Sequence, residues 1–253
     1  MLKVLAARIR QGHRTAPFPN KEMEMEMPAR YLGIPSIEGS KCISDCRKCI
    51  DSCPVSCINK TEKWISIDIG ICIFCGNCAK ECPEGAITFS KNYSMAARRR
   101  DDLVINSVTF KLAEELDRKM KSLFGHSLKL RMVSAGGCNA CESDTNVLNT
   151  LAWDLGRFGI QFVASPRHAD GLVIAGTVTP NMVLALKKTY DAMPFPKIVI
   201  AVGACAISGG IHRGVPGENS GADHIVPVDL YIPGCPPHPA TILDGLLRLL
   251  GRI

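Results

Sequence analysis

The chain has 253 residues, a formal net charge of +6 and thirteen cysteines. This length permits one to three domains with a buried core, and the ordinary apolar content excludes a disordered chain. The odd, high cysteine count and a basic start without a cleavage site argue against secretion and disulfides, and favour metal ligation. No stretch offers the roughly 18 uncharged apolar residues of a membrane span. The basic charge is not interleaved with aromatic residues, so we expect no nucleic-acid partner.

Residues 1–40 are predicted to form an extended N-terminal arm. Leu2, Val4, Leu5 and Ile9 fit one face of a short helix with basic residues around it. After Pro17, three further prolines and the alternating Glu/Met run of residues 22–27 favour an extended strap. A strap of this length is best explained by wrapping around a partner.

Residues 41–92 carry two cysteine ladders, each of which ends in Cys-Pro. The cysteines of the first ladder are Cys42, Cys46, Cys49 and Cys53. Those of the second, which has the bacterial ferredoxin spacing for iron–sulfur ligation, are Cys72, Cys75, Cys78 and Cys82. The first ladder is one residue wider at its start, and its last three cysteines recur 29 positions later. The two ladders are therefore an internal repeat, and the segment is predicted to be a ferredoxin-like domain.

The repeat predicts two 4Fe–4S clusters with crossed ligands, because in two-cluster ferredoxins the cysteine before proline serves the other cluster. The first cluster is assigned to Cys42, Cys46, Cys49 and Cys82. The second is assigned to Cys72, Cys75, Cys78 and Cys53. Cys57 aligns with Ala86, so we interpret it as a small buried thiol and not as a ligand. Zinc sites rarely need two interlocked ladders of this kind.

Residues 93–126 are predicted to be a linker and a helix. The triplet Arg98–Arg100 is interpreted as solvated surface, with a docking patch as the alternative. An apolar face recurs at helical spacing from Val108 to Phe124, and Gly125 is well placed to end that helix.

Residues 127–253 alternate short apolar runs with helical patterns. Buried strands are predicted at residues 128–133, 160–165, 171–176 and 197–202, and helices at residues 144–158, 181–193 and 240–250. Strands that alternate with helices indicate a parallel sheet covered by helices, here a flavodoxin-like α/β domain. The predicted fold class is thus α/β, with a small α+β bacterial-ferredoxin-like domain and an extended arm before it. Function in such a sheet belongs at the carboxyl ends of the strands.

Four cysteines occupy those loops: Cys138, Cys141, Cys205 and Cys235. Each loop is rich in glycine, alanine or proline, which lets the backbone approach a bulky inorganic core and stiffens it there. Four converging thiolates suit a third 4Fe–4S cluster. A tetrahedral zinc ion fits the count too, and a thioredoxin-type CxxC pair is the weaker alternative.

Five stretches resemble the small, electron-transferring subunit of membrane-bound group 4 NiFe hydrogenases, such as formate hydrogenlyase. They are GGCNACE, RFGI, SPRHAD, VGACAISGG and VDLYIPGCPP. The homologous 20 kDa subunit of complex I has adjacent cysteines in the first loop, so the separated Cys138 and Cys141 favour the hydrogenase branch. Residues 1–92 resemble the ferredoxin-like subunit of the same complexes. The chain therefore resembles a fusion of two subunits that are usually separate.

The resemblance implies a chain that carries electrons through three 4Fe–4S clusters, the third being proximal to a NiFe site on a partner large subunit. Its expected partners are that large subunit, the membrane subunits of the complex, and an electron-donating or electron-accepting module, namely formate dehydrogenase, CO dehydrogenase or a ferredoxin. Its expected place is the cytoplasmic side of the cell membrane, held peripherally through partners. The alternatives are the equivalent subunit of a complex I-like quinone oxidoreductase without nickel and, more remotely, a zinc-stapled binding protein.

Three polar residues near the third cysteine group are candidates for supporting roles. The resemblance suggests Glu142 as a proton relay, with an interface carboxylate as an equal alternative. Arg167 and His168 are candidates for hydrogen bonds that tune the proximal cluster, and loop capping is the alternative interpretation.

Overall fold

The structure is a computed structural model that describes residues 2–12, 15–18, 26–61, 65–106, 111–114, 116, 118–217 and 219–253. Its central sheet has five parallel strands: β6 (Leu128–Ser134), β7 (Ile160–Phe162), β8 (Gly171–Ala175), β9 (Ile198–Val202) and β10 (Leu230–Ile232). The spatial order is β10-β9-β8-β6-β7. Counted from the first of these strands along the chain, this order is 2-1-3-4-5, which is the flavodoxin order. The predicted flavodoxin-like domain is confirmed.

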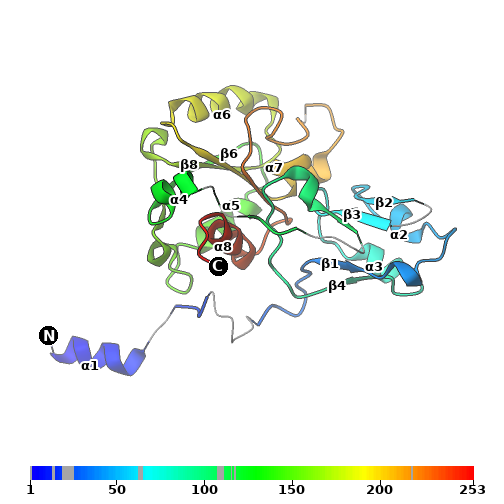
Figure 1. Ribbon diagram of the computed structural model, residues 1–253, viewed down its shortest axis with the longest axis horizontal. Helices are drawn as coiled ribbons and strands as arrows, with labels where there is room; N and C mark the ends of the chain where they lie inside the picture. The colour runs from blue at the N-terminus through cyan, green and yellow to red at the C-terminus, as the bar shows by residue number, and fades with distance from the viewer. Residues whose placement is uncertain are drawn as a thin grey trace.

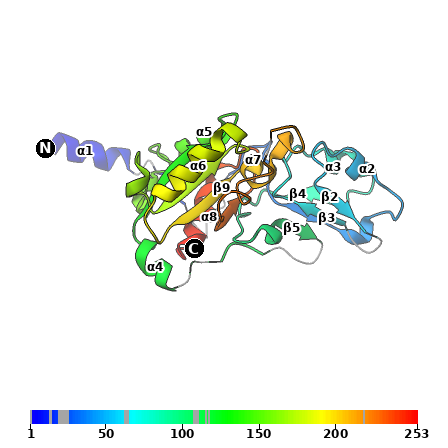
Figure 2. The same cartoon turned by 90° about the horizontal axis from the view of Figure 1, so that it is seen from above.

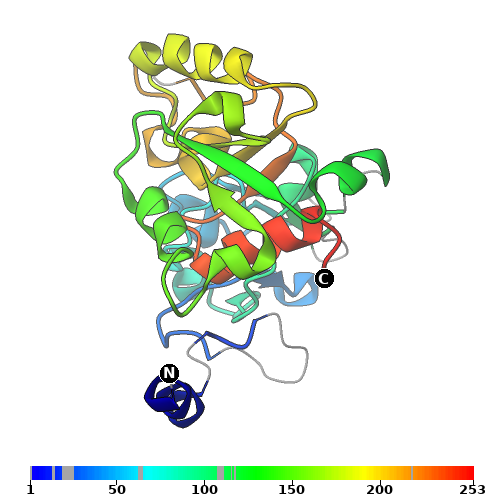
Figure 3. The ribbon, with the colours of Figure 1, turned by 90° about the vertical axis from the view of Figure 1, so that its left-hand side faces the viewer.

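Helices cover both faces of this sheet, as Figures 1 and 3 show for α6 (Pro180–Ala192) and α8 (Pro239–Leu249). Strands β8 and β9 are buried at every position because each face lies against a helix layer. Leu172 and Ile174 pack in the same core as Leu186 of α6. Val173, between them in the sequence, packs in the second core with Leu246 of α8. The alternation of side chains along one strand thus supplies both cores.

Two of the predicted helices differ from the structure. The helix expected at residues 144–158 begins earlier, as α5 (Ala140–Val147), and is followed by the 3-10 helix η3 (Leu155–Phe158). Of the helix expected from Val108 to Phe124, the structure has α4 (Arg118–Phe124). Residues 111–114 are not helical, because the amide of Ala113 donates to the carbonyl of Ala96. Residues 107–110, 115 and 117 lie outside the described residues.

Over its described residues, the ferredoxin-like module has two small sheets and two short helices. Its elements are β1 (Pro35–Ile37), α2 (Lys48–Asp51), β2 (Ile58–Lys60), β3 (Ile65–Asp68), α3 (Asn77–Glu81), β4 (Ile87–Phe89) and β5 (Val104–Asn106). Strand β1 pairs with β4, and β3 pairs with both β2 and β5, all antiparallel. Strands β1 and β5 lie outside the expected bounds of 41 and 92, so the segments on either side of the module complete its sheets.

Short 3-10 helices occupy several of the connections. They are η1 (Gly39–Lys41), η2 (Arg100–Leu103), η4 (Pro166–His168) and η5 (Gly210–His212). The five-residue helix α7 (Ala204–Ser208) follows β9 directly. Of these short elements, η1 directly precedes Cys42 and α7 contains Cys205.

The N-terminal arm packs against this chain's own α/β domain. Phe18 is buried against the rings of Tyr93 and Trp153, and the side chain of Arg157 donates to the carbonyls of Ala16 and Phe18. Helix α1 (Leu2–Gln11) buries no residue, and it stands at the opposite end of the molecule from the module (Figures 1 and 2). Most of the Glu/Met run lies outside the described residues. Among the helices of the described ranges, none combines the length and apolarity that a membrane span requires.

Candidate iron–sulfur sites

The structure brings together the cysteines assigned to the first cluster. One cavity is lined by Cys42, Cys46, Cys49 and Cys82. Burial raises the pKa of the Cys49 thiol, and the charges of the other three cysteines raise this pKa further. The ammonium group of Lys60 donates to the carbonyls of Ile43 and Cys46 at 2.6 and 2.8 Å, and so closes the loop that is one residue wider than its counterpart.

The cysteines assigned to the second cluster are also neighbours. They are Cys53, Cys72, Cys75 and Cys78. Burial raises the pKa of Cys78 to about 12, and the charges of Cys72, Cys75 and Cys53 contribute in the same direction. The amide of Phe74 donates to the Sγ of Cys72 at 3.3 Å. Such an amide is the kind of donor that stabilises a thiolate ligand.

The third group gathers at the carboxyl ends of three parallel strands. Cys138 and Cys141 follow β6, Cys205 lies in α7 after β9, and Cys235 follows β10. Burial raises the pKa of Cys205 to about 11, with the charges of Cys235 and Cys138 as the next causes. Cys138 and Cys235 are exposed. One edge of this group is therefore open at the protein surface.

Glycines leave room around the third group. A Cβ atom on Gly203 would lie 2.4 Å from the Sγ of Cys141, and one on Gly210 would lie 2.9 Å from the Sγ of Cys205. Both distances are below those that real Cβ atoms adopt, so side chains are excluded from this cradle. The loop composition predicted from the sequence thus has a steric basis.

The donor sets fit 4Fe–4S clusters. Each group offers four thiols, and like charge and burial together oppose their ionisation until a cationic centre compensates them. Within the described ranges, no three His, Cys, Asp or Glu side chains converge on a position for a single metal ion. The four thiols of each group match the number of ligands that a 4Fe–4S cluster requires.

Glu142 lies beside the third group, in the first turn of α5. It is buried, and the hydroxyl of Ser134 donates to its Oε1 at 2.5 Å. Its charge is one of the causes, after burial, that raise the pKa values of Cys141 and Cys205. This carboxylate is therefore coupled electrostatically to two of the thiols.

Arg167 and His168 lie in η4, just after β7, and both are exposed. Their side chains make no hydrogen bond with the described cysteines. Their expected role in tuning the third cluster stays a prediction.

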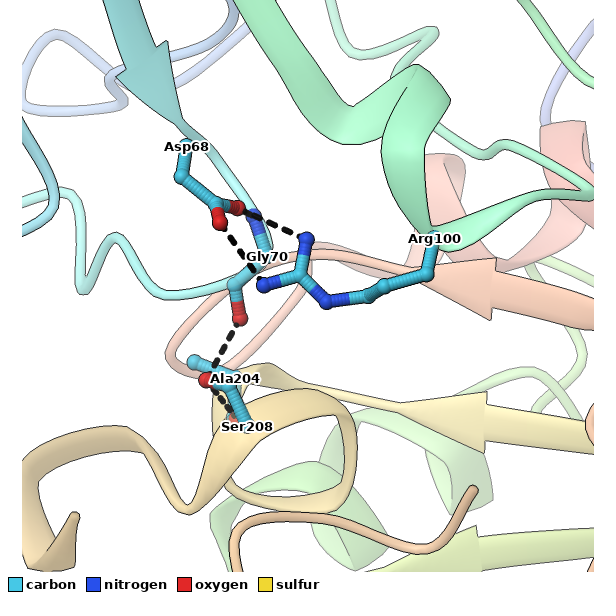
Figure 4. Close-up of polar contacts among 5 residues, drawn as sticks. All are labelled: Asp68, Gly70, Arg100, Ala204 and Ser208. Atoms are coloured by element: carbon cyan, nitrogen blue, oxygen red, sulfur yellow. Dashed lines mark hydrogen bonds and ion pairs between the residues drawn. The ribbon is translucent and has the colours of Figure 1, made fainter. Parts of the chain in front are cut away.

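A polar junction that sequence reasoning missed joins the two domains (Figure 4). Arg100 donates to both carboxylate oxygens of Asp68, at 2.9 and 2.7 Å, and Asp68 also accepts from the amide of Gly70. The carbonyl of Gly70 accepts a hydrogen bond of 2.9 Å from the buried hydroxyl of Ser208 in α7. Arg100 is thus a structural residue of the junction, and its interpretation as solvated surface is wrong.

The junction brings the second and third cysteine groups together. The amide of Cys72 donates to the carbonyl of Asp68, so the ion pair anchors the start of the second ladder. The charge of Cys72 is one of the causes that raise the pKa of Cys235. No local pattern signals this arrangement, because the partners come from distant parts of the sequence.

The fold and the grouped thiols define an iron–sulfur protein. Residues 65–88 match the family model of the 4Fe-4S binding domain. Residues 138–249 match the model described as NADH ubiquinone oxidoreductase, 20 Kd subunit. The chain belongs to this 20 kDa subunit family, and it is a subunit of the oxidoreductase class.

Three relatives illustrate the breadth of the family. A Pyrococcus furiosus protein described as "Probable membrane-bound hydrogenase subunit mbhJ" is 38% identical over 148 residues, which are 58% of this chain and 89% of that protein. A Desulfovibrio desulfuricans protein described as a subunit of NADH-quinone oxidoreductase is 45% identical over 113 residues, 45% of this chain and 61% of that protein. Formate hydrogenlyase subunit 7 of Escherichia coli is 47% identical over 121 residues, 48% of each chain. The matched region thus covers less than two thirds of the latter two proteins.

Proposed function

We propose that the chain is the electron-transfer subunit that links a redox partner module to the catalytic large subunit of a membrane-bound NiFe hydrogenase complex of the formate hydrogenlyase type. The grouping of twelve cysteines into three sets of four, in two joined domains, carries this proposal. The first set holds one 4Fe–4S cluster, the second set another, and Cys138, Cys141, Cys205 and Cys235 hold the proximal cluster. When bound, these clusters supply one-electron transfer.

The residues of the chain support electron transfer by holding its two domains together and by leaving one edge of the third cysteine set exposed to a partner. The Asp68–Arg100 pair and Ser208 hold the loop of the second set against the domain that bears the third set. The exposed Cys138 and Cys235 leave the third set open toward a large-subunit partner. Partner subunits hold the chain peripherally at the cytoplasmic side of the membrane. A module such as formate dehydrogenase, CO dehydrogenase or a ferredoxin exchanges electrons with the first set.

Metal analysis tests the proposal. A tag on this chain allows the native complex to be purified anaerobically, and we expect at least about twelve iron atoms per chain together with stoichiometric nickel in the complex. The protein should be brown and show electron paramagnetic resonance (EPR) signals on reduction. Zinc without iron, in a colourless protein, would instead support the remote zinc-stapled alternative and overturn the electron-transfer proposal.

The second candidate is the equivalent subunit of a complex I-like quinone oxidoreductase. The 45% identity to a protein described as a subunit of NADH-quinone oxidoreductase favours it. The two residues between Cys138 and Cys141 favour the hydrogenase, by the resemblance described above. Full iron without nickel in the purified complex would decide for the quinone oxidoreductase.

We expect the substitution Glu142→Gln to leave the iron content unchanged and to lower turnover of the complex by about tenfold or more, because it removes an ionisable group from a proton path. The solvent deuterium isotope effect on turnover should increase. Ser143→Ala, which removes an exposed hydroxyl from the next residue of the same helix, is the matched control. An unchanged isotope effect and rate would assign Glu142 to the interface instead.

A further inference from the structure

The thiol of Cys57 lies inside the second cysteine group, although the sequence repeat excludes it from the ligands. Its Sγ is 3.5 Å from the Sγ of Cys53, within hydrogen-bonding distance for two sulfur atoms, and the thiol of Cys72 is its other sulfur neighbour. Both neighbours belong to the set proposed for the second cluster. Cys57 is 5% exposed, so water does not compete for its proton.

The equivalent position in the first group is Ala86, and the backbone around the two residues is alike. The amide of Cys57 donates to the Sγ of Cys53 at 3.4 Å, and the amide of Ala86 donates to the Sγ of Cys82 at 3.2 Å. The carbonyl of each accepts an amide hydrogen bond of 2.8 Å from a neighbouring segment. Each residue directly precedes a strand, β2 or β4. The two positions are therefore equivalent except for the side-chain thiol.

We propose that the Cys57 thiol donates a hydrogen bond to a ligand sulfur of the second 4Fe–4S cluster and thereby raises the reduction potential of that cluster. The inference rests on the proposed function, because it requires a cluster at this set of cysteines. A hydrogen bond to sulfur withdraws electron density and stabilises the more negative, reduced state. The first group has alanine at this position and lacks the side-chain donor.

The proposed thiol donor lies at the ferredoxin-like site that is nearer to the α/β domain. The second group is the one that the junction places beside the third group. A higher potential there means that an electron shared between the two ferredoxin-like sites rests more often on the one next to the α/β domain. The thiol thus biases the occupancy of the two sites without adding a ligand.

The test compares Cys57→Ala and Cys57→Ser in the native complex, purified anaerobically and titrated with dithionite while EPR spectra are recorded. Both variants should keep the full iron content. In Cys57→Ala the midpoint potential of one ferredoxin-type signal should fall. At a fixed potential, the ratio of reduced to oxidised cluster should then decrease by up to about tenfold, which is 59 mV for a one-electron couple. Cys57→Ser retains a donor and should restore most of the difference.

The substitution Ala86→Cys is the mirror-image variant, since it places a thiol at the equivalent position of the first group. It should raise the midpoint potential of the other ferredoxin-type signal. Ala86 is buried, so iron is counted first in this variant; should the added sulfur prevent cluster binding, the two Cys57 variants decide alone.

Two outcomes would overturn the inference. If Cys57→Ala keeps its full iron content and both midpoint potentials are unchanged, the Cys57 thiol has only a packing role. Loss of about four iron atoms in the same variant would make Cys57 a ligand. Failure of the proposed function is a separate observation, because it would appear as missing iron in the unsubstituted complex.

Discussion

The substitution Gly203→Ala is expected to remove the third cluster and abolish turnover of the complex, while the iron of the ferredoxin-like module remains. The added Cβ would lie 2.4 Å from the Sγ of Cys141, and the residue has φ +88° and ψ 156°, a region that only glycine adopts readily. Either Cys141 or the start of α7 must move, and α7 carries Cys205. Chemical analysis should find about four fewer iron atoms per chain.

Gly214→Ala is the matched control for this experiment. Gly214 has φ +80°, and no atom lies within 4 Å of a Cβ built on it, so the substitution also places alanine at a positive φ but without the clash. We expect Gly214→Ala to keep full iron and activity. Full iron and activity in Gly203→Ala would contradict the position of the Cys141 thiol at the third group.

The substitution Ser208→Ala is expected to loosen the junction between the two domains. Ser208 is 6% exposed, and its loss would leave the carbonyl of Gly70 without this hydrogen bond, at a cost of about 1–3 kcal/mol. Hydrogen–deuterium exchange of residues 68–72 should accelerate by about tenfold. Electron transfer between the module and the α/β domain should slow, because the loop that bears Cys72 is less firmly placed. Iron content should not change.

Thr189→Ala provides the control for the hydroxyl itself. Thr189 is partly exposed on α6 and donates to the carbonyl of Ala185 four residues earlier, as Ser208 donates to Ala204, but it makes no contact across the junction. Its substitution should leave exchange of residues 68–72 unaltered. Equal exchange in the Ser208→Ala and unsubstituted proteins would show that the Asp68–Arg100 pair alone holds the loop.

The fold of the C-terminal domain was predictable because its strands and helices have clear periodicities. The run of residues 171–175 has no charged residue, as a strand buried on both faces requires. The helix expected at Val108 was less predictable. Its apolar spacing is helical, yet the amide of Ala113 bonds to Ala96 and that of Leu116 to Leu249. Tertiary hydrogen bonds replaced the local ones there.

The cysteine groups could be anticipated because their spacing is local and repeated, and because strand ends of a parallel sheet meet at one edge. The junction could not. Asp68 and Arg100 are 32 residues apart, and Gly70 and Ser208 are 138 apart, so no spacing rule connects them. The sequence repeat identified Cys57 as an extra thiol, but its contact with Cys53 and Cys72 depends on how the loops fold back on each other.

The separation of 138 residues between Gly70 and Ser208 also determines the order in which parts of the chain can fold during synthesis. The strands that frame the first thiol group, β1 and β4, are complete once residue 89 has emerged from the ribosome. The second sheet waits for β5, and the loop that bears Cys72 cannot form its hydrogen bond with Ser208 until α7 follows much later. A nascent chain thus pairs β1 with β4 before it completes the second sheet, and its third thiol group, which needs Cys235, is assembled last. The buried hydrogen bond between Ser208 and Gly70 can form only after both domains have been synthesised. Its formation therefore reports that the two domains have docked.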